Sequence, residues 1–353
     1  MRLRAHLRTP DGETVVRDVV DGHWAEPEGS ADRQVGEGLW ASPGLVDAHA
    51  HFASDTLFQP GDFDTALERL RDTLGGGVTL LLDKGWDDDT AIRAVAAVPP
   101  GERPDVQAAA GILSVDGGYY PGFGRVVTAD ALGEATTRQA RAGLGWVKLI
   151  GDWPRKGVGP VANFDTGQLR AAVDAAEAVG ARVAIHTMAR DVPSFAVAAG
   201  VHSIEHGLFL EEDDLGPLGA RSGMWVPTVL RVEATIEQLG VESSGGRLLA
   251  EGRDRLSRLL PLAIEAGVHV LAGTDLVGRP RDVAAEAIRL AAYGLSNSQV
   301  VAAVSRSPRI ALGQDASFAV GEPADAVWFA ENPVESLGVL SHPAHILRLG
   351  RLN

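Results

Sequence analysis

Eight short apolar runs rich in β-branched residues alternate with longer amphipathic stretches, a pattern that predicts an α/β fold, namely a (β/α)8 TIM barrel. The two ends of the chain carry short strand-like pieces punctuated by Gly and Pro, with no helical period. Neither end is long enough to hold a core alone. We therefore expect a barrel over residues 43–315, which includes a C-terminal helical tail, and a small flanking β-sandwich-like domain built from residues 1–42 and 316–353.

The predicted barrel strands follow one another along the chain with helical segments between them. They are residues 45–51, 78–83, 106–113, 146–150, 183–186, 203–206, 225–229 and 268–275. One helix signal is especially clear at 165–179, where Asp165 can cap the first turn, Gln168 completes a capping box and Gly180 ends the helix.

Composition excludes several classes of protein. The 353 residues are 45% hydrophobic and 22% charged, as in ordinary globular proteins, and the net charge of -15 would repel a nucleic-acid backbone. No stretch approaches the roughly 18 apolar residues of a membrane span, and the N-terminus lacks the apolar core of a signal peptide. We therefore expect a cytoplasmic protein with a small-molecule partner, and we leave a homo-oligomer open.

The chain has no cysteine, so a metal site must be built from histidine, carboxylate or a modified side chain. The basic residues are almost all arginine, and the exceptions are Lys84, Lys148 and Lys156. Each lysine therefore raises the question of what arginine could not do at that position.

Two histidines stand at i and i+2 in the first predicted strand, His49 and His51. On a strand their side chains share a face, whereas on a helix they would point about 200° apart. Both can reach one metal ion only if this segment is extended.

Four more candidates stand near the carboxyl ends of later predicted strands, and they are Lys148, His186, His206 and Asp275. In a barrel of this type that end is the active-site face. By the same criterion His202 and His269, at strand starts, are expected to be structural.

These six residues, in this order, resemble the amidohydrolase superfamily of metal-dependent hydrolases, and within it the branch of imidazolonepropionase-like proteins and prolidase-like dipeptidases. The similarity covers nearly the whole chain. Its motifs are Pro-Gly-Leu-Val-Asp-Ala-His-Ala-His at 43–51, Ser-Ile-Glu-His-Gly at 203–207, Gly-Thr-Asp at 273–275 and Gly-Glu-Pro-Ala-Asp-Ala-Val-Trp-Phe at 321–329.

The resemblance implies two divalent metal ions, zinc by ligand type, in a binuclear centre. One ion would be held by His49, His51 and Asp275, and the other by His186 and His206. Lys148 would bridge them after N6-carboxylation by carbon dioxide, a reaction closed to arginine because its guanidinium is not deprotonated. A metal-bridging hydroxide would then cleave an amide, a cyclic amide or a related C–N bond. Asp275 would carry the proton from the attacking water to the leaving amine.

Loop residues over the predicted metal face are the candidates for substrate binding, and they are Tyr119, Tyr120, Arg155 and Arg231. An arginine can hold a substrate carboxylate, and the tyrosines can contact an apolar group. The sequence has Gly-Gly-Tyr at 117–119 where several prolidase-like relatives carry Gly-Gly-His, and Arg231 where they carry an aromatic residue. Glu205 and Asp47 are candidates to orient the histidine ligands.

Three alternatives stay open at this point. One is a mononuclear imidazolonepropionase-like hydrolase or deaminase that does not modify Lys148, and another is a prolidase-like dipeptidase. The third is a barrel that has lost catalysis and serves in binding or assembly. Dinucleotide-binding, P-loop and serine-hydrolase folds are excluded because the sequence lacks their glycine-rich and nucleophile motifs.

Overall fold

The computed structural model describes residues 2–54 and 62–353. Its largest element is a ten-stranded sheet whose main path runs β6-β7-β8-β11-β14-β15-β16-β17, and neighbouring strands along this path are parallel. These strands span Leu45–Ala50, Val78–Asp83, Asp105–Ala109, Gly145–Ile150, Arg182–Thr187, Ser203–His206, Met224–Val226 and His269–Val270. The short strands β9 (Leu113–Ser114) and β10 (Arg125–Val126) lie off the path. The expected α/β fold class is confirmed, and the curled parallel sheet is consistent with the predicted (β/α)8 barrel.

The last part of the curled sheet returns to the first strand. The N–H of Asp275 donates to the carbonyl of His49 at 2.8 Å. The buried carboxylate of Asp47 adds three bonds, because Oδ1 accepts the N–H groups of His49 (3.0 Å) and Thr274 (3.1 Å) and Oδ2 accepts the Thr274 hydroxyl (2.6 Å). β6 and the segment after β17 are therefore tied together where the first predicted ligands lie.

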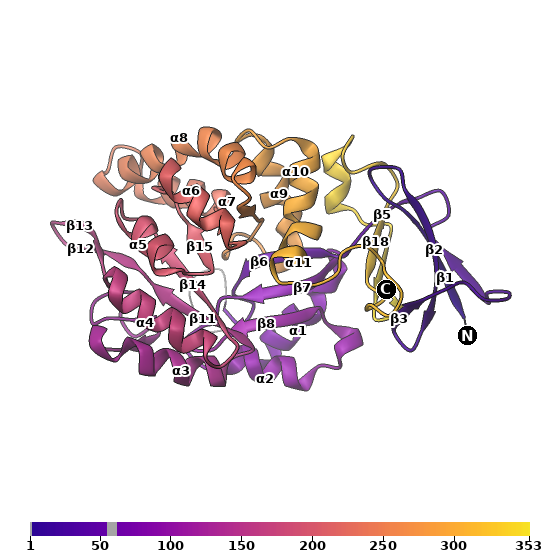
Figure 1. The fold of residues 1–353 in the computed structure, drawn as a ribbon, viewed down its shortest axis with the longest axis horizontal. Coiled ribbons are helices and arrows are strands. Elements are labelled where there is room, and N and C mark those ends of the chain that lie inside the picture. Colours follow the sequence, from indigo (N-terminus) through magenta and orange to yellow (C-terminus); the bar gives the residue numbers. More distant parts are fainter. Residues whose placement is uncertain (1, 55–61) are drawn as a thin grey trace.

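Helices cover the outside of the curled sheet, as Figure 1 shows. They are α1 (Phe63–Gly75), α2 (Thr90–Ala97), α3 (Leu132–Ala142), α4 (Thr166–Glu177), α5 (Val192–Ala199), α6 (Glu212–Ala220), α7 (Val229–Leu239), α8 (Ser244–Glu265), α9 (Val283–Ala291), α10 (Asn297–Ala303) and α11 (Arg306–Ala311). The predicted capping box of α4 is present, with Asp165 accepting from the N–H of Gln168. Within the described ranges, no helix is both long and apolar enough to cross a membrane.

A second sheet of eight strands joins the two ends of the chain, with indigo and yellow strands side by side in Figure 1. Its strands are β1 (Leu3–Arg8), β2 (Thr14–Val20), β3 (His23–Ala25), β4 (Arg33–Val35), β5 (Trp40–Ser42), β18 (Ala326–Phe329), β19 (His345–Arg348) and β20 (Arg351–Leu352). The antiparallel pairing of β5 with β18 connects the two ends. That these residues form a separate β-sandwich-like domain stays a prediction.

Three predicted strands differ from the observed ones. The run 225–229 ends at Val226 because Pro227 has no N–H and Thr228 has a φ of 46°, after which α7 begins. The run 268–275 is a strand only at His269–Val270, and Asp275 takes a φ of 40°. The run 106–113 is split into β8 and β9. Local backbone geometry at the active-site ends therefore interrupts the regular strand pattern.

We predict that Glu286→Ala destabilises the fold, because this buried side chain on α9 holds the first turn of α7. Its two carboxylate oxygens accept the N–H groups of Val229 (2.6 Å) and Leu230 (2.9 Å). Loss of these acceptors should lower the free energy of unfolding by about 2 to 4 kcal/mol in chemical denaturation. The matched control is Glu237→Ala at an exposed position of α7. We expect it to change the free energy of unfolding by less than about 0.5 kcal/mol. Equal losses in both variants would contradict this role.

Candidate metal centre

The two histidines of the first strand converge on one carboxylate. His49 lies in β6 and His51 just after it, and both are buried. Their Nε2 atoms lie 3.5 Å and 3.6 Å from Asp275 Oδ1. The ligand atoms of these three residues all lie within 4.8 Å of one another, so the group could hold a metal ion.

A polar contact on the far side of each ring orients these two imidazoles. His51 Nδ1 lies 2.7 Å from the carbonyl of Gly85, and since a carbonyl only accepts, Nδ1 carries the proton and Nε2 the lone pair. His49 Nδ1 makes an ion-pair contact with Glu205 Oε2 at 2.6 Å, and the adjacent carboxylate favours the proton on Nδ1. Both lone pairs therefore face Asp275. The expected role of Glu205 is supported by this contact, whereas Asp47 binds backbone N–H groups.

A second pair of nitrogen donors lies on the other side of Asp275. His206 Nε2 lies 2.9 Å from His186 Nδ1 and 3.9 Å from Asp275 Oδ2. The Thr228 hydroxyl donates to the carbonyl of Pro227 (2.9 Å), so it accepts from His206 Nδ1 (2.6 Å). The lone pair of His206 Nε2 consequently faces His186. Asp275 thus presents Oδ1 to His49 and His51, and Oδ2 to His206.

Lys148 has the properties of a lysine that can become a ligand. It lies in β11, is 2% exposed, and its Nζ has no hydrogen-bond partner among the described residues. Burial lowers the pKa of its ammonium to about 8. Burying an ammonium without a hydrogen-bond partner is energetically costly, so the neutral amine is favoured. A neutral amine can add to carbon dioxide.

Burial sets the protonation of the other donors as well. It lowers the pKa of His51 to about 4 and that of His206 to about 3, so both imidazoles are neutral at pH 7. Burial would raise the pKa of Asp275, but neighbouring His49 and Arg231 outweigh it and keep the pKa below its usual value. Neutral imidazoles beside an ionised carboxylate are the state that metal binding requires. The donor set therefore fits a divalent cation.

Three of the four predicted substrate residues lie around this centre. Tyr119 and Tyr120 contact Trp153, with ring centroids 4.8 Å and 4.7 Å apart, and Trp153 lies 5.8 Å from the ring of His186. Arg231, on α7, donates from Nε to the carbonyl of Asp275 at 2.7 Å. Trp153 follows β11 at the active-site face and joins the two tyrosines to the histidines.

Arg155 has a different place. Its guanidinium donates to Asn163 Oδ1 at 3.1 Å and to the carbonyl of Asp116 at 3.5 Å. These bonds attach the hairpin of β12 (Asp152–Arg155) and β13 (Gly159–Ala162) to the loop that carries the tyrosines. Arg155 thus supports the aromatic contacts, and the structure shows no approach of its side chain to the histidines.

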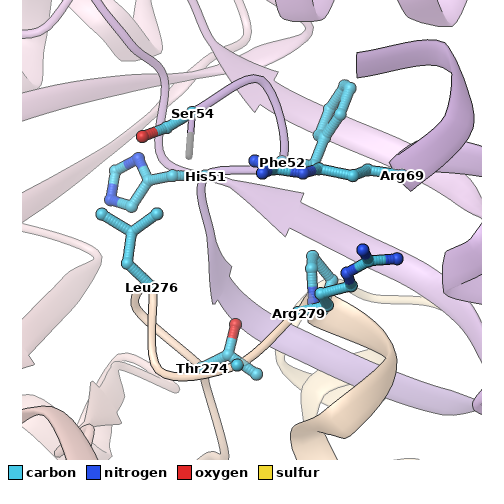
Figure 2. Close-up of a pocket in the computed structure, with 9 residues that line it drawn as sticks. His51, Phe52, Ser54, Arg69, Thr274, Leu276 and Arg279 are labelled. Carbon is cyan, nitrogen blue, oxygen red and sulfur yellow. The ribbon is translucent and has the colours of Figure 1, made fainter. Parts of the chain in front are cut away.

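A cavity of about 240 Å³ adjoins His51, between the loops that follow β6 and β17 (Figure 2). Phe52 and Leu276 contribute apolar walls, and Arg69 and Arg279 contribute cationic side chains. The cavity therefore lies next to the first group of metal donors and has a positively charged side.

The family model described as "Amidohydrolase family" matches residues 40–348. The chain belongs to the amidohydrolase family and is a hydrolase acting on carbon–nitrogen bonds, which confirms the family expected from the motifs.

Individual proteins are similar over most of the chain. An uncharacterized protein of Mycobacterium tuberculosis is 32% identical over 365 residues, which cover 99% of this chain and 95% of that relative. Ochratoxinase of Aspergillus niger is 25% identical, with 88% of this chain and 75% of the relative covered.

Two solved structures share the fold. A Xaa-Pro dipeptidase with bound methionine in the active site superposes with a TM-score of 0.85 at 20% identity, covering 100% of both chains. The structure of A. niger ochratoxinase has a TM-score of 0.79 at 20% identity, covering 99% of this chain and 95% of that one.

We predict a pH-dependent effect of Asp152→Asn. Asp152 is buried, accepts the N–H of Met188 after β14 (2.9 Å), and burial raises its pKa to about 7. The folded chain therefore keeps a proton that the unfolded chain releases above about pH 4, so the stability linked to this group is lost as the pH rises through 7. The amide keeps an acceptor oxygen and cannot titrate.

The melting temperature of Asp152→Asn relative to the unsubstituted protein should therefore rise between pH 5 and pH 8. Asp116→Asn, at an exposed position, serves as the control and should give a nearly flat difference. A flat difference for Asp152→Asn as well would show that this carboxyl titrates alike in both states.

Proposed function

We propose that the protein is a binuclear metal-dependent amidohydrolase with carboxylated Lys148 as the bridging ligand. The observation that carries the proposal is the arrangement of two pairs of histidine nitrogens on either side of Asp275, beside a buried lysine amine without a hydrogen-bond partner. A one-metal hydrolase or deaminase would have no use for this lysine.

In this proposal His49, His51 and Asp275 hold one ion, His186 and His206 hold the second, and zinc suits the neutral imidazoles. Bound divalent ions supply a Lewis acid and a water that is activated at neutral pH. The neutral amine of Lys148 forms a bond to the carbon of carbon dioxide and releases one proton to solvent. The resulting carbamate offers an anionic oxygen to each ion, which an ammonium cannot.

The residues around the ligands supply proton transfer and substrate contacts. The Asp275 carboxylate takes a proton from the attacking water and delivers it to the leaving nitrogen. Its ionised state, which this role requires, is favoured by the adjacent Arg231. The phenols of Tyr119 and Tyr120 and the indole of Trp153 form an aromatic wall for an apolar group of a small-molecule substrate.

A prolidase-like dipeptidase is the second candidate, and Arg231 is the observation that favours it. Its guanidinium is attached to Asp275, so it places a cation beside the scissile bond, where the carboxylate of a dipeptide would lie. The similar fold of a Xaa-Pro dipeptidase supports this class, and the similarity to an ochratoxinase supports testing other amides.

We predict that Lys148→Ala reduces bound metal from about two ions per chain to one or fewer and abolishes most amidase activity, because the bridging anion is lost. Protein from cultures with added zinc and bicarbonate would be measured by elemental analysis. Lys156→Ala, at an exposed position of the hairpin, is the matched control and should keep both ions. Short carboxylates such as acetate should partly restore metal to Lys148→Ala by occupying the vacated space. If Lys148→Ala keeps both metal ions and the full amidase rate, Lys148 is not a carboxylated bridging ligand.

We also predict that Trp153→Ala raises KM about 2- to 10-fold for an amide with an aromatic acyl group and leaves KM for the acetyl analogue nearly unchanged, since one aromatic contact contributes about 0.5 to 1.5 kcal/mol. Val158→Ala, at the exposed tip of the same hairpin, is the control for a general disturbance of the hairpin. Equal changes for both substrates would show that the aromatic wall does not select the acyl group.

A further inference from the structure

Lys84 is a fully buried cation that the proposed reaction does not use. It follows β7 directly and has no exposed surface. A buried ammonium is costly unless it is paired. Its Nζ lies 3.2 Å from Glu205 Oε1 and 4.3 Å from the centre of the Trp146 ring, so an anion and an aromatic face both compensate its charge.

Glu205 connects Lys84 to the metal centre, because its two oxygens have different partners. Oε1 faces Lys84 and accepts the hydroxyl proton of Ser203 at 2.6 Å, whereas Oε2 lies 2.6 Å from His49 Nδ1. The side chains of Lys84, Glu205 and His49 are all at most 1% exposed, so water does not substitute for any of these contacts. A continuous path therefore runs from the Lys84 ammonium to a ring that faces Asp275.

The direction of these contacts determines what Lys84 can do. An ionised carboxylate attracts an N–H and repels a lone pair, so the ion-pair contact of Glu205 Oε2 with His49 Nδ1 favours the proton on Nδ1 and leaves the Nε2 lone pair facing Asp275. Oε1 is held from the other side by two groups, the Ser203 hydroxyl at 2.6 Å and the Lys84 ammonium at 3.2 Å, and Lys84 supplies the charge. Lysine suits this position because its ammonium is compact, whereas the larger planar guanidinium of an arginine would need space that this buried site does not offer.

We propose that Lys84 is a positioning residue of the metal centre, which holds Glu205 against His49 and thereby directs His49 Nε2 toward the metal position. The inference rests on the proposed function in one respect, that His49 is a metal ligand. Lys84 and Lys148 are the two buried lysines, and the role assigned to Lys84 is distinct from that of Lys148, since Lys84 acts through two other side chains and carries no modification.

The test is the metal affinity of Lys84→Met, which keeps the length and apolar stem of lysine and removes the charge. Chelator-treated protein would be titrated with zinc against a competing chelator in bicarbonate buffer, and with cobalt(II) followed by visible absorption. Partners of metal-binding histidines contribute about 10- to 100-fold to affinity, so we expect a loss of that size and a changed cobalt spectrum. Lys156→Met, the same substitution at an exposed site, should match the unsubstituted protein in both measurements.

Two other roles for Lys84 predict different results. If its charge acted only through space, removing a cation near the site would tighten metal binding. If it only stabilised the fold, Lys84→Met would lower the melting temperature of the metal-free protein and leave the cobalt spectrum and the zinc affinity unchanged. Either result would overturn the proposal.

The double variant Lys84→Met/Glu205→Gln shows whether Lys84 acts through Glu205, and it removes both buried charges in case the single variant fails to fold. If Lys84 acts through Glu205, the double variant should bind zinc as weakly as Glu205→Gln alone. A loss equal to the product of the single losses, or a Glu205→Gln variant with unchanged affinity, would overturn the proposal. Absence of metal binding by the unsubstituted protein would instead refute the proposed function, so the two failures are distinguishable.

Discussion

The carboxylate of Asp47 ties the first strand of the curled sheet to the segment that follows its last strand. Its bonds to the backbone of His49 and Thr274 bring together residues 227 positions apart in the chain. His49 and Asp275, which provide facing ligand atoms, are held by this junction and by the backbone bond between them. A metal site assembled from both edges of the sheet depends on this closure, because an opening there would separate the ligands.

Burial acts on the groups around this junction in opposite ways according to their charge. For the histidines and Lys148 it disfavours the cationic form and leaves nitrogen lone pairs available. For Glu205 burial alone would raise the pKa, but the adjacent charge of Lys84 opposes it, and the pKa lies below its usual value. The site thus keeps its nitrogen donors neutral and its carboxylates ionised. Such buried polar groups cost stability, and their accumulation at one end of the sheet is typical of a functional site.

Sequence reasoning succeeded where the periodicity of a strand decides the outcome. His49 and His51 share a face because side chains two apart on a strand do so, and Lys148, His186 and His206 lie on or at the carboxyl ends of parallel strands. It failed at strand ends with unusual backbone, such as Asp275 with a φ of 40°. Substrate binding by Arg155 stays a prediction, and its bonds to its own hairpin and a neighbouring loop are contacts that no spacing could indicate.

The sequence by itself determined the fold class, the family and the identity of the candidate ligands, because these follow from local periodicity and from motifs of a few adjacent residues. Only the tertiary structure decided how the ligands are oriented. Glu205 on His49, Gly85 on His51 and Thr228 on His206 fix which nitrogen of each ring carries the proton, and each partner lies on a different part of the chain from its histidine. The pairing of Lys84 with Glu205 was likewise decided by the tertiary structure, since contacts across a curled sheet depend on strand order and side-chain reach that a linear pattern does not contain.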